Sequence, residues 1–198
     1  MRTSGEAYSG GEVSKVFNDA IEYAKKAHEG QTRKGSDVPY IEHPLEVADI
    51  VKTMTDDEAV WAAAVLHDTV EDTAISIEDI EREFGKRIAD LVASDTENKR
   101  SDLPAAETWK IRKQETIDHL NKTDDVSEKM IVLADKLSNI RQIADNYKKI
   151  GDLVWQGFNQ KDKNEHSWYY KSILEATREL SGYSAWWEYK KLVEQVFG

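Results

Sequence analysis

Apolar residues recur at helical spacing along most of this chain. In the segment from 15 to 30, "KVFNDAIEYAKKAHEG", they fall three and four positions apart. Ser76 and Asp79 form the pattern of a capping box before a further helix, which Gly85 ends. The same spacing predicts helices over residues 44–54, 56–70, 86–96, 105–122 and 126–151, and two more around 165–181 and 184–197. No segment alternates with period two, so we predict an all-α fold, a single compact domain of roughly eight to ten helices.

The start of the chain differs from the rest. Residues 1–12 contain Gly5, Gly10 and Gly11 and no apolar stretch. We therefore predict a flexible N-terminus over 1–12 and one helical domain over 13–198. Without an apolar signal segment or a run long enough to span a bilayer, we expect a cytoplasmic protein that does not bind membranes. The chain has no cysteine, which excludes disulfides and thiolate metal sites.

The formal net charge of −11 narrows the range of partners. A protein that wraps nucleic acid needs a basic surface to neutralise phosphates, so we expect no nucleic-acid partner. A small phosphorylated ligand is not excluded, because it needs only a local basic pocket. Nothing in the composition predicts an oligomeric state.

Charged residues gather at the end of the predicted helix 56–70, in "LHDTVEDT". At about 100° per residue, His67 and Glu71 lie within about 40° of each other, on the stripe that also carries Val60 and Ala63. Asp68 and Asp72 lie at about 100° and 140° from His67. A solvated charged end would lie opposite the apolar stripe. The pattern therefore predicts a pocket bordered by these side chains.

A metal site is one interpretation of this cluster. The nitrogen and oxygen of His67 and Asp68 suit a divalent ion such as manganese, iron, cobalt or zinc, but two ligands are too few. Asp135 lies in the apolar stretch "IVLADKLSNIR" and needs a strong partner, either a metal or a buried arginine. His43, just before Pro44, is a candidate ligand or a capping or core histidine. An incidental acidic helix end remains the alternative.

Four sequence motifs, in a fixed order along the chain, resemble those of a known enzyme superfamily. The blocks "YIEHPLEVADIV", "AAVLHDTVEDT", "FGKRIADLV" and "LADKLSNIR" resemble the HD superfamily of metal-dependent phosphohydrolases. More narrowly, the chain from about residue 16 to 170 resembles the alarmone (p)ppGpp hydrolases, both the small stand-alone enzymes and the hydrolase half of bifunctional stringent-response enzymes. The resemblance implies a 3′-pyrophosphohydrolase that converts ppGpp or pppGpp to GDP or GTP plus pyrophosphate.

The resemblance also implies roles for individual residues. It implies one ion, usually manganese, held by His43, His67, Asp68 and Asp135, which acidifies a water and neutralises phosphate charge. Glu71 and Asp72 would hold or deprotonate the attacking water and assist the leaving group; their alternative is a solvated helix end.

Substrate contacts are implied for four polar residues. Arg33 and Lys34 match a basic pair that contacts phosphate, Lys99 would add to the basic rim, and Asn139 matches an asparagine near the nucleotide. The alternatives are an exposed loop for the basic residues and a core hydrogen bond for Asn139.

Two departures from the long enzymes leave the guanine contacts open. The long enzymes commonly have histidine and threonine where this chain has Ser138 and Gln142. The alternative functions are hydrolysis of another nucleotide, such as removal of the NADPH 2′-phosphate, and non-catalytic nucleotide sensing.

Overall fold

The computed structural model describes residues 15–33, 37–100 and 102–198, and every regular element in these ranges is helical. The predicted all-α class is confirmed. The predicted flexible segment 1–12 lies outside the described residues. The α-helices are α1 (Lys15–Ala27), α2 (Glu42–Lys52), α3 (Glu58–Leu66), α4 (Thr69–Asp72), α5 (Ile77–Phe84), α6 (Lys86–Asp95), α7 (Ala105–Leu120), α8 (Val126–Ile150), α9 (Lys163–Ala176) and α10 (Ser184–Phe197); the 3-10 helices are η1 (Gly151–Gly157) and η2 (Arg178–Gly182).

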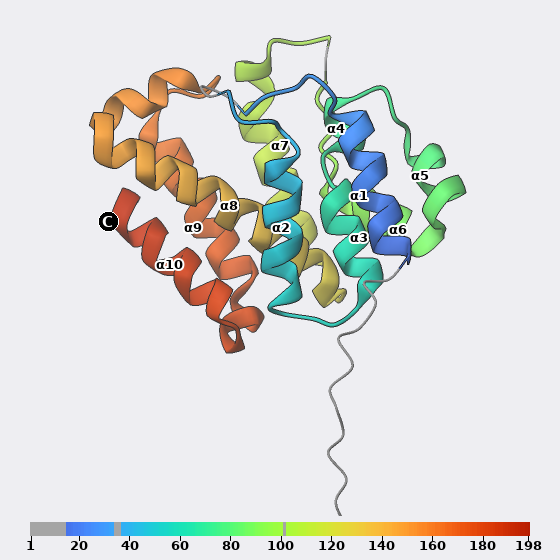
Figure 1. Ribbon diagram of the computed structural model, residues 1–198. Helices are drawn as coiled ribbons and strands as arrows, with labels where there is room; N and C mark the ends of the chain where they lie inside the picture. Colours follow the sequence, from blue (N-terminus) through green and yellow to red (C-terminus); the bar gives the residue numbers. More distant parts are fainter. Residues whose placement is uncertain (1–14, 34–36, 101) are drawn as a thin grey trace, which may run out of the picture.

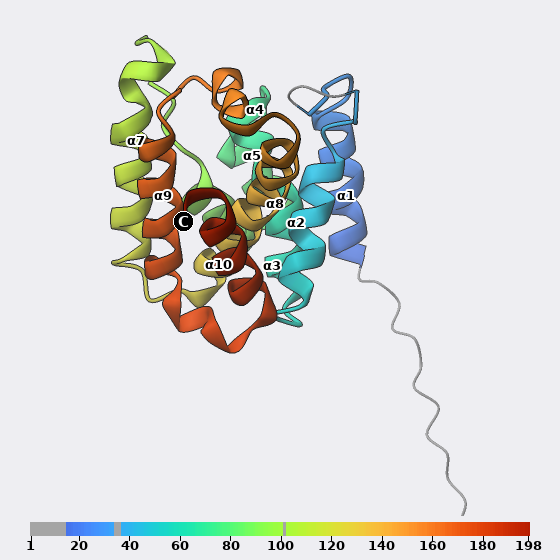
Figure 2. The same cartoon turned by 90° about the vertical axis from the view of Figure 1, so that its left-hand side faces the viewer.

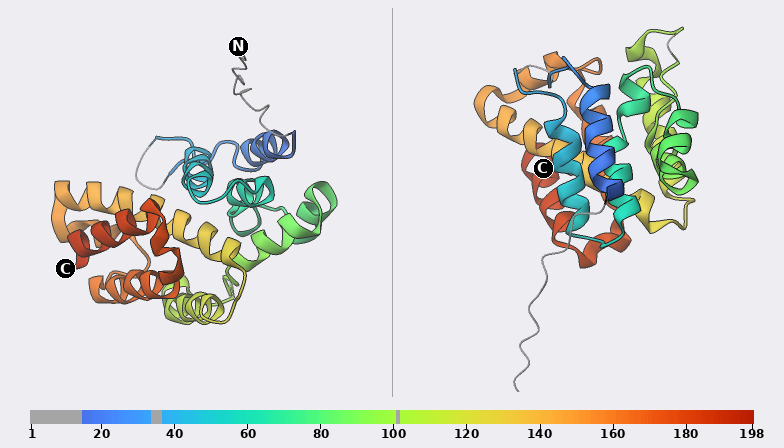
Figure 3. Two further views of the ribbon diagram at one scale, coloured as in Figure 1. Left: turned by 90° about the horizontal axis from the view of Figure 1, so that it is seen from below. Right: turned by 45° about the vertical axis from the view of Figure 1, so that its right-hand side comes forward.

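The long helix α8 is the centre of the arrangement. It contacts α2, α3 and α6 from the first half of the chain and α9 and α10 from the second (Figure 1 and Figure 3). In the view of Figure 2, α7 and α9 run side by side, in agreement with their contacts. Side chains from both halves of the chain therefore meet along α8. No helix in the described ranges combines the length and the apolar composition needed to cross a membrane.

Helix α3 is buried at Val60 and from Ala62 to Leu66, and it is shorter than predicted. Asp57 caps its start by accepting a hydrogen bond from the Ala59 amide at 2.9 Å. The predicted continuous helix over 56–70 is wrong, because α3 ends at Leu66 and α4 begins at Thr69. His67 bonds the Ala64 carbonyl at 2.8 Å and Thr69 donates to the Leu66 carbonyl at 2.6 Å, so side chains occupy acceptors of the last turn.

The loop before α2 folds back on itself. An isolated antiparallel bridge joins Thr32 to Pro39, with a hydrogen bond from the Tyr40 amide to the Gln31 carbonyl at 2.9 Å. The Gln31 side chain donates to the Asp72 carbonyl at 3.1 Å, which ties this loop to α4. The loop thus stands beside the charged end of α3.

Candidate metal centre

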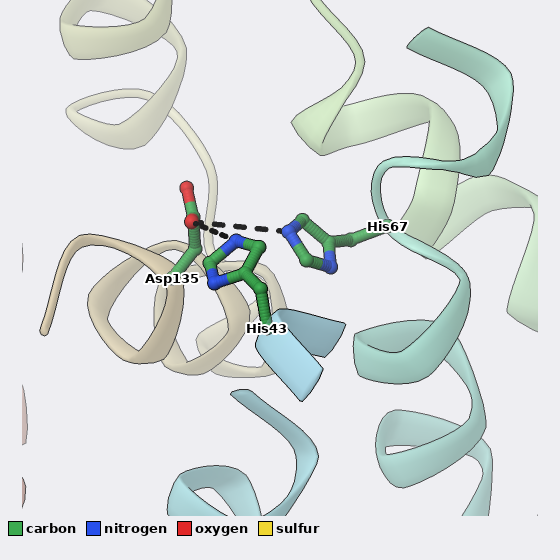
Figure 4. A group of neighbouring side chains, drawn as sticks. All are labelled: His43, His67 and Asp135. Carbon is green, nitrogen blue, oxygen red and sulfur yellow. Dashed lines mark ion pairs between the residues drawn. The ribbon is translucent and has the colours of Figure 1, made fainter. Parts of the chain in front are cut away.

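Three buried side chains from distant parts of the chain point at one another (Figure 4). His43 lies in the first turn of α2, His67 follows α3, and Asp135 is in the middle of α8, with at most 4% of each residue exposed. Their ligand atoms all lie within 4.8 Å of one another. Asp135 Oδ1 is 3.1 Å from Nε2 of His43 and 3.8 Å from Nε2 of His67.

Asp68 lies at the edge of this group. It is not among the three residues whose atoms are all within 4.8 Å of one another. Its Oδ2 nevertheless lies 3.0 Å from His67 Nε2 and 3.5 Å from His43 Nε2. Tyr40 donates its hydroxyl hydrogen to the same oxygen at 2.6 Å. The structure therefore brings all four predicted ligand residues together, and we count Asp68 with the other three.

The imidazoles are oriented as ligands would be. His67 donates from Nδ1 to the Ala64 carbonyl, and its buried Nε2 makes no hydrogen bond of acceptable geometry within the described residues. The Ser138 hydroxyl donates to Glu46 at 2.7 Å, so it accepts from His43 Nδ1 at 2.9 Å. On each ring Nε2 is therefore the nitrogen that faces the carboxylates and is left to take a proton or a cation. A pair of imidazoles with fixed outer nitrogens and two carboxylates fits a borderline divalent cation.

The charges around His67 favour a positive charge at this position. Burial alone would lower the pKa of His67, but the adjacent carboxylates of Asp68 and Asp135 raise it to about 10. Burial opposes ionisation of Asp135 as well, yet Lys136 and the two imidazoles hold the pKa of its carboxyl well below the usual range. Without a cation the cluster binds protons; a divalent ion would compete with them for the same nitrogen.

An outer layer links His43 to the C-terminal helix. Glu46 accepts from Ser138 through Oε2 and from Arg141 Nη1 through Oε1 at 2.8 Å. Arg141 in turn donates twice to Glu188 of α10, each time at 2.7 Å. Such outer partners fix the tautomer and orientation of a metal-binding histidine. Sequence reasoning missed this function of Ser138 and Glu46, because the two residues are 92 positions apart.

Removing the Ser138 hydroxyl tests this outer layer. Ser138→Ala leaves His43 Nδ1 and Glu46 without their shared partner, so we expect the affinity for manganese to fall by about 10- to 100-fold. Ser94→Ala is the matched control, because the Ser94 hydroxyl donates within its own helix, to the Leu91 carbonyl. Calorimetric titration with manganese measures both; equal affinities in the two variants would contradict the assignment.

Glu71 and Asp72 lie beside the four ligand residues and differ in environment. Glu71 is half-buried and accepts from the Glu97 amide at 3.4 Å, whereas Asp72 is exposed. Burial, assisted by the charges of Asp68 and Glu97, raises the pKa of Glu71 to about 7. A carboxyl group with this pKa can accept and return a proton at neutral pH.

The four residues predicted to contact the substrate have different surroundings in the structure. Arg33 Nη1 lies 3.6 Å from Glu46 Oε2, and Asn139 donates to Asp135 Oδ1 at 2.6 Å. Lys99 Nζ lies 2.5 Å from Asp72 Oδ1 and 3.7 Å from Glu71 Oε1, so it belongs to the carboxylate pair. Lys34 lies outside the described residues.

A cavity of about 430 Å³ opens beside the ligand residues. Arg33, Tyr40 and His43 line the end near Asp135. One face of α8 and the following η1 line the rest, with three side-chain amides and five apolar side chains: Asn139, Gln142, Asn146, Ile143, Ile150, Leu153, Val154 and Phe158. The volume is that of a small-molecule site. The spacing 139, 142, 146 along one helical stripe could have indicated Gln142 and Asn146.

Comparisons with known proteins agree with this arrangement. The model of the HD domain matches residues 20–159. The guanosine-3′,5′-bis(diphosphate) 3′-pyrophosphohydrolase MESH1 of Drosophila melanogaster is 33% identical over 168 residues, which cover 83% of this chain and 86% of that protein. The GTP pyrophosphokinase rsh of Brucella melitensis is 38% identical over 133 residues; these cover 65% of this chain but only 17% of that protein.

Solved structures share the fold over nearly the whole chain. A metazoan ortholog of SpoT that hydrolyses ppGpp superposes with a TM-score of 0.73 at 30% identity, covering 92% of this chain and 96% of that chain. The crystal structure of lmo0812 from Listeria monocytogenes gives a TM-score of 0.70 at 34% identity, covering 82% and 100%.

Proposed function

This chain belongs to the HD domain family, and on that premise we propose that it is a metal-dependent 3′-pyrophosphohydrolase of ppGpp and pppGpp. The observation that carries the proposal is the convergence of two imidazoles and two carboxylates beside a half-buried Glu71 and a cavity of about 430 Å³. The relatives named for ppGpp hydrolysis support the substrate.

His43, His67, Asp68 and Asp135 would hold one divalent cation, which we propose to be manganese. Two nitrogen and two oxygen donors suit manganese. A divalent cation bound there acidifies water and neutralises charge on the phosphate. In the ionised Asp135, Oδ2 contacts Lys136, while Oδ1 faces both imidazoles and accepts from Asn139.

Glu71 is the proposed base for the attacking water. Its pKa of about 7 lets it take the proton at neutral pH, and the Glu97 amide orients it. Asp72 would help to hold the water, and it fixes Lys99 at 2.5 Å. The water oxygen joins the phosphorus next to the ribose, the bond to the 3′ oxygen breaks, and the proton passes to that oxygen.

The nucleoside would occupy the cavity beside α8. Arg33 and Lys34 would contact phosphate, and Asn139 would direct its remaining amide oxygen toward the ligand. The side chains of Gln142 and Asn146 line this cavity together with apolar residues of η1, so the cavity offers a flat base both polar and apolar contacts.

A substrate panel tests the proposed function. For the manganese-loaded protein we expect pyrophosphate release from ppGpp and pppGpp with kcat/KM at least about tenfold above that for phosphate release from NADPH or GTP, a difference of about 1.4 kcal/mol. Phosphate release from NADPH without pyrophosphate release from ppGpp would show that ppGpp is not the substrate, and it would leave the proposed metal centre unchallenged. Tight binding of ppGpp without hydrolysis of any substrate would indicate a sensor.

A further inference from the structure

A hydrogen-bonded link joins the end of α1 to α4, and the proposed mechanism does not use it. His28 follows directly after α1 and is only 3% exposed. Its Nδ1 lies 2.9 Å from Oε1 of Gln31, and Nε2 of Gln31 donates to the Asp72 carbonyl at 3.1 Å. The link therefore ends at the last residue of α4, directly after Glu71 (Figure 1).

The directions of the hydrogen bonds in this link follow from the chemistry of its groups. A backbone carbonyl only accepts, so the nitrogen of the Gln31 amide faces Asp72 and its oxygen faces His28. An amide oxygen also only accepts, so Nδ1 of His28 carries the proton. If the Gln31 amide turned over, both hydrogen bonds would be lost. The imidazole of His28 thus fixes the direction in which this amide points.

The other nitrogen of His28 has a cost that packing does not explain. Nε2 is buried and has no hydrogen-bond partner within the described part of the chain. Such an atom is destabilising, because it has lost its water and gained no bond in return. An apolar ring could fill the same space against the ring of Tyr40, whose centre lies 4.8 Å away, without this cost. The Nδ1 hydrogen is the feature of His28 that an apolar ring would lack.

Helix α4 depends on contacts with other parts of the chain for its position. It has only four residues, and a single helical turn is not stable on its own. Carbonyls in the last turn of a helix lack partners within the helix, and Gln31 provides a donor for the last one. Tyr40 adds a hydrogen bond to the Asp72 side chain at 3.3 Å. Because Glu71 precedes Asp72 in this turn, the contacts that hold Asp72 also place Glu71.

We propose that Gln31 is a positioning residue for Glu71 and Asp72, and that His28 holds the Gln31 amide in the orientation this requires. The inference rests on the proposed function, in which Glu71 takes a proton from the attacking water. A small displacement of a base lowers the rate of the chemical step strongly, because proton transfer needs a close and aligned contact. The side chain of Gln31 bonds His28 and Asp72, so its loss should slow that step and leave cation and nucleoside binding nearly unchanged.

Steady-state kinetics of the manganese-loaded protein with ppGpp test this inference. Gln31→Met keeps the length of the side chain and removes both hydrogen bonds, so kcat should fall by about tenfold or more while KM and manganese affinity stay within about threefold. His28→Phe keeps a ring against Tyr40 and should also lower kcat, although the melting temperature should stay the same or rise because the unpartnered Nε2 is gone. The double variant should lower kcat no further than Gln31→Met, since both changes act through one contact.

Amide hydrogen exchange gives a second measurement that needs no substrate. Amide protons of residues 69–73 should exchange about tenfold faster in Gln31→Met than in the wild type, and those of α9 should exchange at the same rate in both. Gln114→Met is the matched control, because Gln114 donates to Asp118 on the exposed surface of α7 at 2.8 Å. It should leave both kcat and exchange unchanged.

Three outcomes overturn the inference: wild-type kcat in both Gln31→Met and His28→Phe, unchanged exchange of residues 69–73, or an equal loss of kcat in Gln114→Met. If Gln31→Met fails to fold, His28→Phe decides alone. Faster exchange in the variants of a protein that does not hydrolyse ppGpp would retain the link to α4 and reject the proposed function. Hydrolysis of ppGpp with unchanged kcat in the variants would do the reverse.

Discussion

Asp68→Asn is expected to lower kcat/KM for ppGpp by at least about 1,000-fold, a loss of about 4 kcal/mol of transition-state stabilisation. Asp68 Oδ2 lies within 3.5 Å of Nε2 of both histidines, so the substitution removes one of two anionic donors from the proposed cation site. Asparagine retains the shape and an oxygen that can accept from Tyr40. Manganese affinity, measured by calorimetry, should fall together with activity.

Asp49→Asn is the control for this change. Asp49 is an exposed carboxylate on α2 that pairs with Lys52, one turn away. Its loss changes the net charge equally and leaves the proposed centre intact. Full activity and unchanged manganese affinity in Asp68→Asn would show that Asp68 is not a ligand.

Glu71→Gln should lower kcat for ppGpp by about 100- to 10,000-fold, the usual range for a lost general base, with little change in manganese affinity. In the wild type, activity should fall on the acid side as Glu71 becomes protonated. Its pKa is about 7 without a cation, and a bound divalent ion lowers it, so the decline should lie below pH 7. A pH–rate profile measures this; the remaining activity of Glu71→Gln should lack the decline.

The same substitution should stabilise the metal-free protein. A carboxyl group whose pKa is raised from 4.5 to about 7 on folding contributes stability that is fully present below pH 4.5 and is lost as the pH rises through about 7. Glutamine carries no charge at any of these pH values. The free energy of unfolding of Glu71→Gln should therefore exceed that of the wild type by about 2 to 3 kcal/mol at pH 8 and by little at pH 4.

Denaturant titration at the two pH values measures this difference, with Glu78→Gln on α5 as the control. Glu78 is exposed, so its replacement should not change stability with pH in this way. If Glu71→Gln is inactive and also less stable than the wild type at pH 8, Glu71 has a structural function instead.

Local pattern predicted the helices well and failed where side chains bond the backbone. The periodicity of apolar residues gave the fold class, and the capping box of Ser76 and Asp79 is present as expected. The break after Leu66 was not predicted, because helical spacing continues through His67 and Thr69 while their side chains take carbonyls of the last turn. The inward direction of His67 holds despite the break, since it lies only one position beyond α3.

Asp135 and His67 could be anticipated from the residues alone because each breaks a local rule, whereas the full set with His43 and Asp68 came from the family resemblance. Asp135 places a carboxylate among buried apolar residues, and a polar residue in such a place indicates a partner. The residues that contact His43 from outside the proposed site show no such departure from the expected sequence pattern. Ser138 and Glu46 are ordinary helix residues, and their contact is set by the packing of α2 against α8. Sequence also could not indicate that Lys99 pairs with Asp72, because the two residues are 27 positions apart.

The bond between Arg141 and Glu188 makes the last helix a thermodynamic partner of the proposed cation. Glu188 holds Arg141, which holds Glu46, which orients His43 through Ser138. Coupling between two equilibria is reciprocal, so any free energy that docked α10 adds to cation binding is returned by the cation to the docking of α10. Amide protons of residues 184–197 should accordingly exchange more slowly when manganese is bound, so occupancy of the proposed cation site becomes measurable in α10.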